Sequence, residues 1–113
     1  HGLGVMLDWL HAEGMHGLVV AGTTGEWPSL APEERKQLFS AVAAQMAGRL
    51  PLLAGCTAYR ANDVLDFARH AADVGFDGIL VTPPPYLRPD ETEILGYYSD
   101  ISAKSPLPIC VYN

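Results

Sequence analysis

The chain has 113 residues with 49% hydrophobic residues, and 7 Lys and Arg against 13 Asp and Glu give a formal net charge of −6. This composition is typical of a globular domain, and the acidic balance argues against nucleic acid or an anionic membrane surface as a partner. Two cysteines are too few for a disulfide scaffold, and the apolar runs are too short to span a bilayer, so we expect a cytoplasmic protein.

Helical and strand-like patterns alternate along the chain. Apolar residues at helical spacing predict helices, and short aliphatic runs without alternation predict parallel strands. The predicted order is a helix over 3–10, a strand within 14–20, a helix over 32–46, a strand over 50–55, a helix over 64–72, a strand within 75–81, a helix over 90–101 and a strand over 107–112. The strands are expected to be buried on both faces.

Two of these strands repeat one template. Residues 14–20 and 75–81 both read Gly, apolar, polar, Gly and three aliphatics, at an offset of 61 residues. That offset fits two βα units of about 30 residues each.

The predicted helix starts differ in quality. Asp90 with Glu93 forms a capping-box pattern, whereas Ala31 stands where a capping hydroxyl is expected, an omission that should cost about 1 kcal/mol unless Ser29 compensates. Pro32 and the acids after it suit a first helical turn. The charged run over residues 33–36 predicts a solvated helix face.

Strict alternation indicates an α/β fold with a parallel sheet and right-handed crossovers. A doubly wound open sheet and a (β/α)8 TIM barrel both satisfy it. The uniform repeat, and the absence of a G-x-G-x-x-G motif after any strand, favour the barrel. Four strands are half of a barrel, which usually needs about 250 residues.

The two ends of the sequence also favour a partial barrel. The sequence opens at His1 in a helical pattern without an initiator Met, and it stops in or just after an apolar run at residues 109–113. Because an unpaired strand edge invites aggregation, domains seldom end there. We expect residues 1–113 to be a partial barrel domain, truncated at both ends; a short chain with trimmed ends is the alternative.

Hydroxyl groups and glycines follow the predicted strands, where parallel α/β folds place their sites. These residues lie at 22–27, 55–59, 82–86 and 112–113. Hydroxyls with free backbone amides suit a small carboxylate, and Tyr and Thr suit a proton relay. A plain strand-to-helix turn for 22–25 and packing roles for Tyr86 and Tyr112 remain open alternatives.

Other reactive residues predict no site. The histidines have no metal-ligand spacing and are interpreted as structural or solvated, and we expect no metal. The two cysteines are expected to be small buried hydrophobes. These residues are His11, His16, His70, Cys56 and Cys110.

Three ordered segments resemble one family. Gly-Thr-Thr-Gly-Glu at 22–26 with the helix start at 32–35, Thr-Pro-Pro at 82–84 with Tyr86, and Tyr112-Asn113 resemble the signatures of the dihydrodipicolinate synthase/N-acetylneuraminate lyase family. The resemblance covers essentially the whole chain. It implies a (β/α)8 barrel of which this chain is helix 1 through strand 5.

The resemblance also implies class I aldolase chemistry, in which a lysine forms a Schiff base with pyruvate or a related 2-oxo acid without any cofactor. Carried over by position, Thr23 and Thr24 bind the substrate carboxylate, Thr23 relays protons, and Tyr112 is the general acid/base. Tyr86 matches a tyrosine that completes the relay across a dimer interface, in proteins that are usually homotetramers. Pro85 departs from the family, where a second tyrosine is common beside the relay tyrosine.

Three functions therefore stay open. The resemblance favours a synthase-like enzyme, but sugar-acid aldolases and dehydratases share the threonine pair. A non-catalytic relative that binds a small carboxylate is the second reading, and a free-standing βα interaction module is the third. Lys36 lies in a predicted helix and Lys104 at the end of another, so neither is at the carboxyl end of a strand. The resemblance implies that the Schiff-base lysine is on the strand after Asn113.

Overall fold

The computed structural model describes residues 2–113 and contains every predicted helix and strand. The elements in chain order are α1 (Gly2–Ala12), β1 (Leu18–Val20), the 3-10 helix η1 (Trp27–Ser29), α2 (Pro32–Met46), β2 (Leu52–Gly55), α3 (Ala61–Val74), β3 (Gly78–Val81), α4 (Glu91–Lys104) and β4 (Ile109–Val111). None of the helices in this stretch is both long and apolar enough to cross a membrane.

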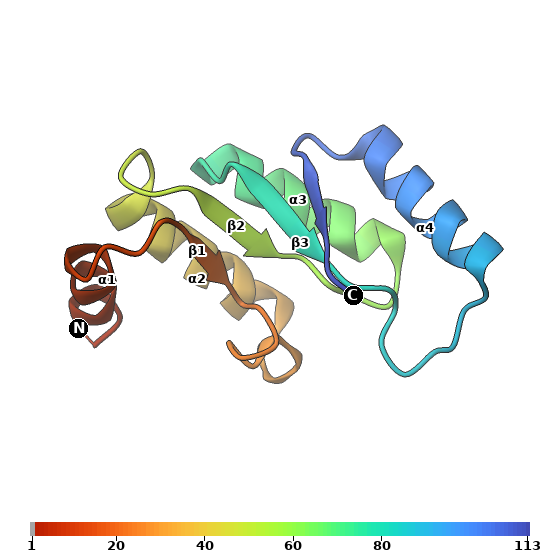
Figure 1. The fold of residues 1–113 in the computed structure, drawn as a ribbon, viewed down its shortest axis with the longest axis horizontal. Coiled ribbons are helices and arrows are strands. Elements are labelled where there is room, and N and C mark those ends of the chain that lie inside the picture. Colours follow the sequence, from red (N-terminus) through yellow and green to blue (C-terminus); the bar gives the residue numbers. More distant parts are fainter. Residues whose placement is uncertain (1) are drawn as a thin grey trace.

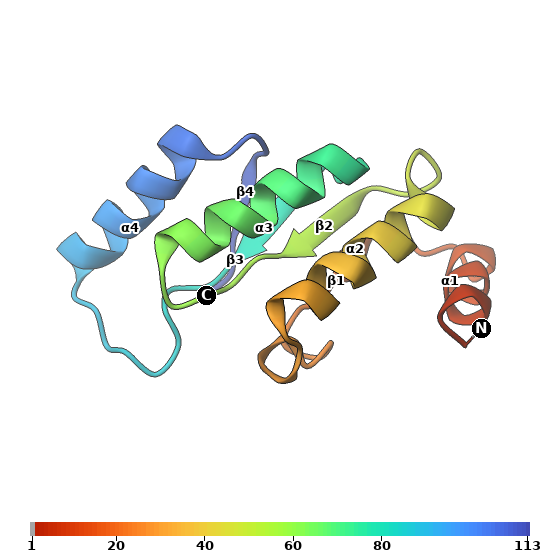
Figure 2. The ribbon, with the colours of Figure 1, turned by 180° about the vertical axis from the view of Figure 1, so that it is seen from behind.

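The four strands form one parallel sheet in the order β1-β2-β3-β4. A doubly wound sheet reverses its strand order at a switch point and carries helices on both faces. Here the order is sequential, and α2, α3 and α4 cover one face (Figures 1 and 2). The predicted α/β fold of the (β/α)8 barrel class is confirmed, with these elements as its N-terminal part.

The core lies between the sheet and its three covering helices. Because successive side chains of a strand point to opposite faces, only alternate strand residues reach it. The buried set includes Leu52, Ala54, Ile79 and Val81 from the strands, and Phe39, Val42, Met46, Val64, Leu65 and Ala68 from α2 and α3.

The opposite face of the sheet is open. Val19 is 51% exposed and Cys110 is exposed, because no element of residues 2–113 covers that side. The prediction that the strands are buried on both faces is therefore wrong within this stretch. The prediction for Cys110 as a buried hydrophobe is also wrong, whereas Cys56 is fully buried as expected, and burial raises the pKa of its thiol to about 12.

The ends of the helices follow local sequence. The carboxylate of Asp90 accepts from the backbone N–H of Glu93, and Glu93 accepts from the N–H of Asp90, as the capping box predicts. Gly75 ends α3 with φ of 100°, a left-handed conformation that glycine adopts without strain. At the start of α2, Ala31 supplies no side-chain cap, and Glu34 accepts the Ala31 N–H instead.

Candidate functional site

Hydroxyl side chains from the two ends of the sequence meet at the carboxyl edge of the sheet. Thr23, Thr24 and Tyr112 line one hollow of about 260 Å³, together with Val19, Gly22, Gly25 and Leu80. No charged side chain lines this hollow. Two threonine hydroxyls, a phenol and exposed glycine backbone can bind a small carboxylate and pass a proton.

A close backbone contact sets the position of the turn that carries the threonines. The chain leaves β1 at Ala21, which has a φ of 55°. There the backbone passes so close to Gly55 at the end of β2 that a Cβ on Gly55 would lie 2.1 Å from the Ala21 carbonyl oxygen. Only glycine fits, and the turn then closes with a bond of 3.0 Å from the Glu26 N–H to the Thr23 carbonyl.

Tyr112 follows β4 directly and is still paired with the sheet. Its N–H donates to the Val81 carbonyl over 3.0 Å. The same carbonyl accepts the hydroxyl of Tyr98 from α4 over 2.9 Å, and burial raises the pKa of Tyr98. The Tyr112 backbone is therefore held in register, while its side chain remains 47% exposed toward the hollow.

Arg35 is buried, so the prediction of a solvated helix face over residues 33–36 is wrong at this position. The residue is only 4% exposed. Its guanidinium donates to the carbonyls of Trp27 (3.2 Å) and Thr57 (2.9 Å), and burial lowers its pKa. The helical spacing could have shown this, because Arg35 stands four residues before Phe39 and seven before Val42, on the buried stripe of α2.

Tyr86 lies apart from the hollow. It is 95% exposed at the tip of the loop between β3 and α4, and its φ of 69° is unusual for a residue with a side chain. Within residues 2–113 it contributes nothing to the cluster of Thr23, Thr24 and Tyr112. Its role in a relay between subunits stays a prediction.

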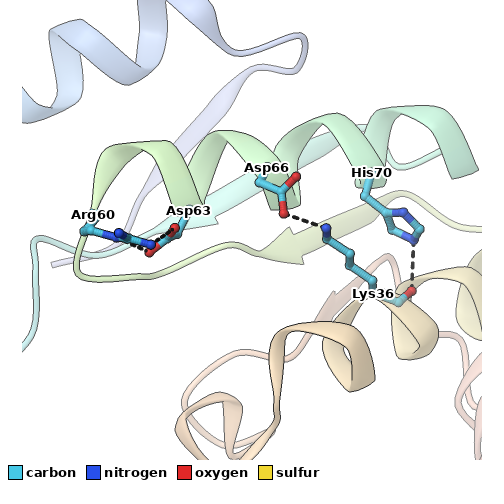
Figure 3. Close-up of polar contacts among 5 residues, drawn as sticks. All are labelled: Lys36, Arg60, Asp63, Asp66 and His70. Carbon is cyan, nitrogen blue, oxygen red and sulfur yellow. Dashed lines mark hydrogen bonds and ion pairs between the residues drawn. The ribbon is translucent and has the colours of Figure 1, made fainter.

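The chain's two lysines lie on helices, away from the strand ends. Lys36 of α2 pairs with Asp66 of α3 at 2.5 Å, beside a contact of 3.0 Å between His70 Nε2 and the Lys36 carbonyl (Figure 3). Lys104 ends α4 and pairs with Asp100. Both lysines are therefore occupied in surface ion pairs, as their predicted positions on helices imply.

The histidines behave as interpreted from the sequence. His11 and His16 are exposed, and His70 bonds to Ser40 Oγ at 2.9 Å and to the Lys36 carbonyl between α2 and α3. Across residues 2–113, no three His, Cys, Asp or Glu side chains gather as metal ligands would.

Comparison with known proteins agrees with this arrangement. Residues 2–113 match the dihydrodipicolinate synthetase family. The chain is 36% identical over 112 residues to the 4-hydroxy-tetrahydrodipicolinate synthase of Gluconacetobacter diazotrophicus, covering 99% of this chain and 38% of that protein. It is 37% identical over 108 residues to the enzyme of that name from Rhizobium meliloti, covering 96% and 37%.

A solved structure of a family member shows the same fold. A prophage protein of the dihydrodipicolinic acid synthase family from E. coli K12, crystallised in complex with pyruvate, superimposes with a TM-score of 0.94 at 30% identity, over 99% of this chain and 38% of that one. The chain thus spans less than two fifths of the length of the relatives that it matches.

Proposed function

Because the chain belongs to the dihydrodipicolinate synthetase family, we propose that it is part of a Schiff-base (class I) enzyme, a lyase or synthase that acts on pyruvate or a related 2-oxo acid. The observation that carries the proposal is the meeting of Thr23, Thr24 and Tyr112 at one hollow. Folding alone does not require three hydroxyls at that place. The names of the relatives favour 4-hydroxy-tetrahydrodipicolinate synthase as the specific activity.

In the proposed mechanism the hydroxyls and backbone amides of Thr23 and Thr24 hold the carboxylate of the 2-oxo acid. A lysine amine adds to the ketone carbon, and water leaves as the Schiff base forms. The amine nitrogen loses two protons and the carbonyl oxygen gains two before it leaves as water. Tyr112, as general base and then general acid, carries these protons from nitrogen to oxygen, with the Thr23 hydroxyl passing protons on. Neither Lys36 nor Lys104 can supply the amine from its helix surface, so the proposal requires a lysine outside residues 1–113.

Three further expectations belong to the proposal. The enzyme is a homo-oligomer, a dimer or tetramer, in which the exposed Tyr86 contacts a neighbouring subunit and joins the relay. It needs no cofactor, since the amine activates the substrate. The low number of cysteines fits a reducing cytoplasm.

Trapping of the Schiff base tests the proposal. The full-length protein that carries this sequence is incubated with pyruvate and borohydride, and the reduced adduct is mapped by peptide mass spectrometry. We expect an adduct on one lysine outside residues 1–113, which is absent when pyruvate is left out. Labelling of Lys36 or Lys104 would contradict the mechanism, and no adduct with any 2-oxo acid would favour a non-catalytic carboxylate-binding relative.

A further inference from the structure

Arg35 is a buried cation that forms no ion pair with a carboxylate of residues 2–113. It is 4% exposed, and none of the salt bridges within residues 2–113 includes it. Its Nε has no hydrogen-bond partner. Burying a charge without a counter-charge is costly, and an apolar side chain of similar length could fill the same space in the core. The reason for an arginine at this position must therefore lie in the groups that it contacts.

The guanidinium joins two segments that are far apart in sequence. Nη2 donates to the Trp27 carbonyl, just after the turn that carries Thr23 and Thr24, and Nη1 donates to the Thr57 carbonyl just after β2. Only the planar fork of an arginine donates in two fixed directions at once. The guanidinium carbon also lies over two aromatic rings, 4.9 Å from the centre of the Trp27 ring and 4.3 Å from that of Phe67.

A second contact extends this connection to the next strand. The hydroxyl of Thr57, which is 3% exposed, accepts the backbone N–H of Thr82 over 3.1 Å, directly after β3. A continuous chain of polar contacts thus joins the segments that follow β1, β2 and β3. It runs through Trp27, Arg35, Thr57 and Thr82. The Thr23 and Thr24 turn is attached to this chain through Trp27, whose N–H reaches back to the Gly22 carbonyl at 3.5 Å.

We propose that Arg35 is a positioning residue, which holds the turn over residues 22–27 against the ends of β2 and β3 so that Thr23 and Thr24 face the hollow. It does not touch the substrate. Its effect on carboxylate binding rests on the proposed function, but its effect on the turn does not. A displacement of about 1 Å in such a turn can lower the rate by about 100-fold.

The test compares Arg35→Lys and Arg35→Met with Arg49→Met in the full-length protein. Arg49 is a matched control because it is an exposed arginine just after α2, paired with Asp8 at 3.3 Å. Lysine keeps the positive charge at position 35 but cannot donate to the Trp27 and Thr57 carbonyls in two fixed directions. Amide hydrogen exchange is followed along residues 22–30 and along β2 and β3, and pyruvate KM and kcat are measured in the same samples.

In Arg35→Lys we expect exchange at least tenfold faster at residues 22–30 with little change in β2 and β3, and a pyruvate KM raised about tenfold. Arg49→Met should change neither. Unchanged exchange at 22–30 in a folded Arg35→Lys protein overturns the proposal. Acceleration spread equally over the sheet, or failure of both variants to fold, also overturns it, because Arg35 is then a general core residue.

The two proposals fail in different ways. A wild-type protein that forms no adduct with pyruvate contradicts the proposed function, and the exchange pattern of Arg35→Lys still decides whether Arg35 holds the turn. A locally loosened turn with an unchanged pyruvate KM in an active enzyme contradicts the part of the proposal that concerns the carboxylate.

Discussion

The turn after β1 and the loop after β3 follow strands with nearly the same sequence, but they are held in different ways. The segment after β1 (residues 21–31), which includes the turn over residues 22–27, is held against other elements by the close approach of Gly55 and by the buried Arg35. The loop (residues 82–90) is bonded to another segment at its first residue, where the Thr82 N–H donates to Thr57, but it is exposed at its tip and ends at its own N-cap, Asp90. A repeated strand template therefore does not predict which contacts hold the following segment.

The largest expected effect concerns the hydroxyls of the turn. Under the proposed function, Thr23→Val removes a proton-relay hydroxyl at nearly constant shape, and kcat should fall by about 10²–10⁴-fold, the range of general acid–base catalysis. Thr92→Val, the same change in the first turn of α4 after the loop, should leave kcat within twofold. Steady-state kinetics of the full-length enzyme measure both. Full activity of Thr23→Val would make the turn a purely structural one.

The next effect concerns the contact that holds the turn. Gly55→Ala forces a Cβ against the Ala21 carbonyl, and the free energy of unfolding should drop by about 1–3 kcal/mol or more. Gly96→Ala is the control, because a Cβ at this position of α4 meets nothing within 4 Å. That change should raise stability by about 0.5–1 kcal/mol through helix propensity. Denaturant titrations compare the two, and equal effects of the same sign would refute the contact.

Two substitutions at helix N-termini should change the stability by smaller amounts and in opposite directions. Asp90→Ala removes the cap that ends the loop and should lower stability by about 1 kcal/mol. Ala31→Ser adds a capping hydroxyl where the turn ends, with the extended backbone that a cap needs, and should raise stability by a similar amount. Asp90→Ser, which keeps a capping oxygen, serves as the control. If Ala31→Ser is neutral, Glu34 already satisfies the start of α2.

The smallest effect concerns the exposed tip of the loop. Tyr86 has a left-handed backbone that asparagine tolerates better, so Tyr86→Asn should raise the stability of the subunit by less than about 1 kcal/mol. Tyr59→Asn, at another exposed tyrosine without a positive φ, should not. If Tyr86 contacts a neighbouring subunit, sedimentation should show weaker association for Tyr86→Asn alone. Lower stability of Tyr86→Asn would indicate that the side chain packs within its own subunit.

The amino-acid sequence by itself determined the elements of this protein and their order. Helical spacing, aliphatic runs, the Asp90–Glu93 pattern and the glycine at 75 are signals between residues a few positions apart, and the structure confirms each of them. The placement of Thr23, Thr24 and Tyr112 at strand ends followed from the same local signals. Their position at one edge of the sheet followed once the strands were taken as parallel. Their meeting at one hollow, from the first and last strands of the sheet, is shown by the structure.

Only the tertiary structure decided which residues are enclosed and how the turns are held. Helical spacing places Arg35 on the buried stripe of α2, but only the structure shows that Trp27 and Phe67, from η1 and α3, enclose its guanidinium. Cys110 lies in an aliphatic run, yet it is exposed because burial of a strand residue depends on what covers its face of the sheet. Gly55 is required only because Ala21, 34 positions earlier, passes against it. Such contacts join residues distant in sequence, and the chemical character of a residue alone does not reveal its partner.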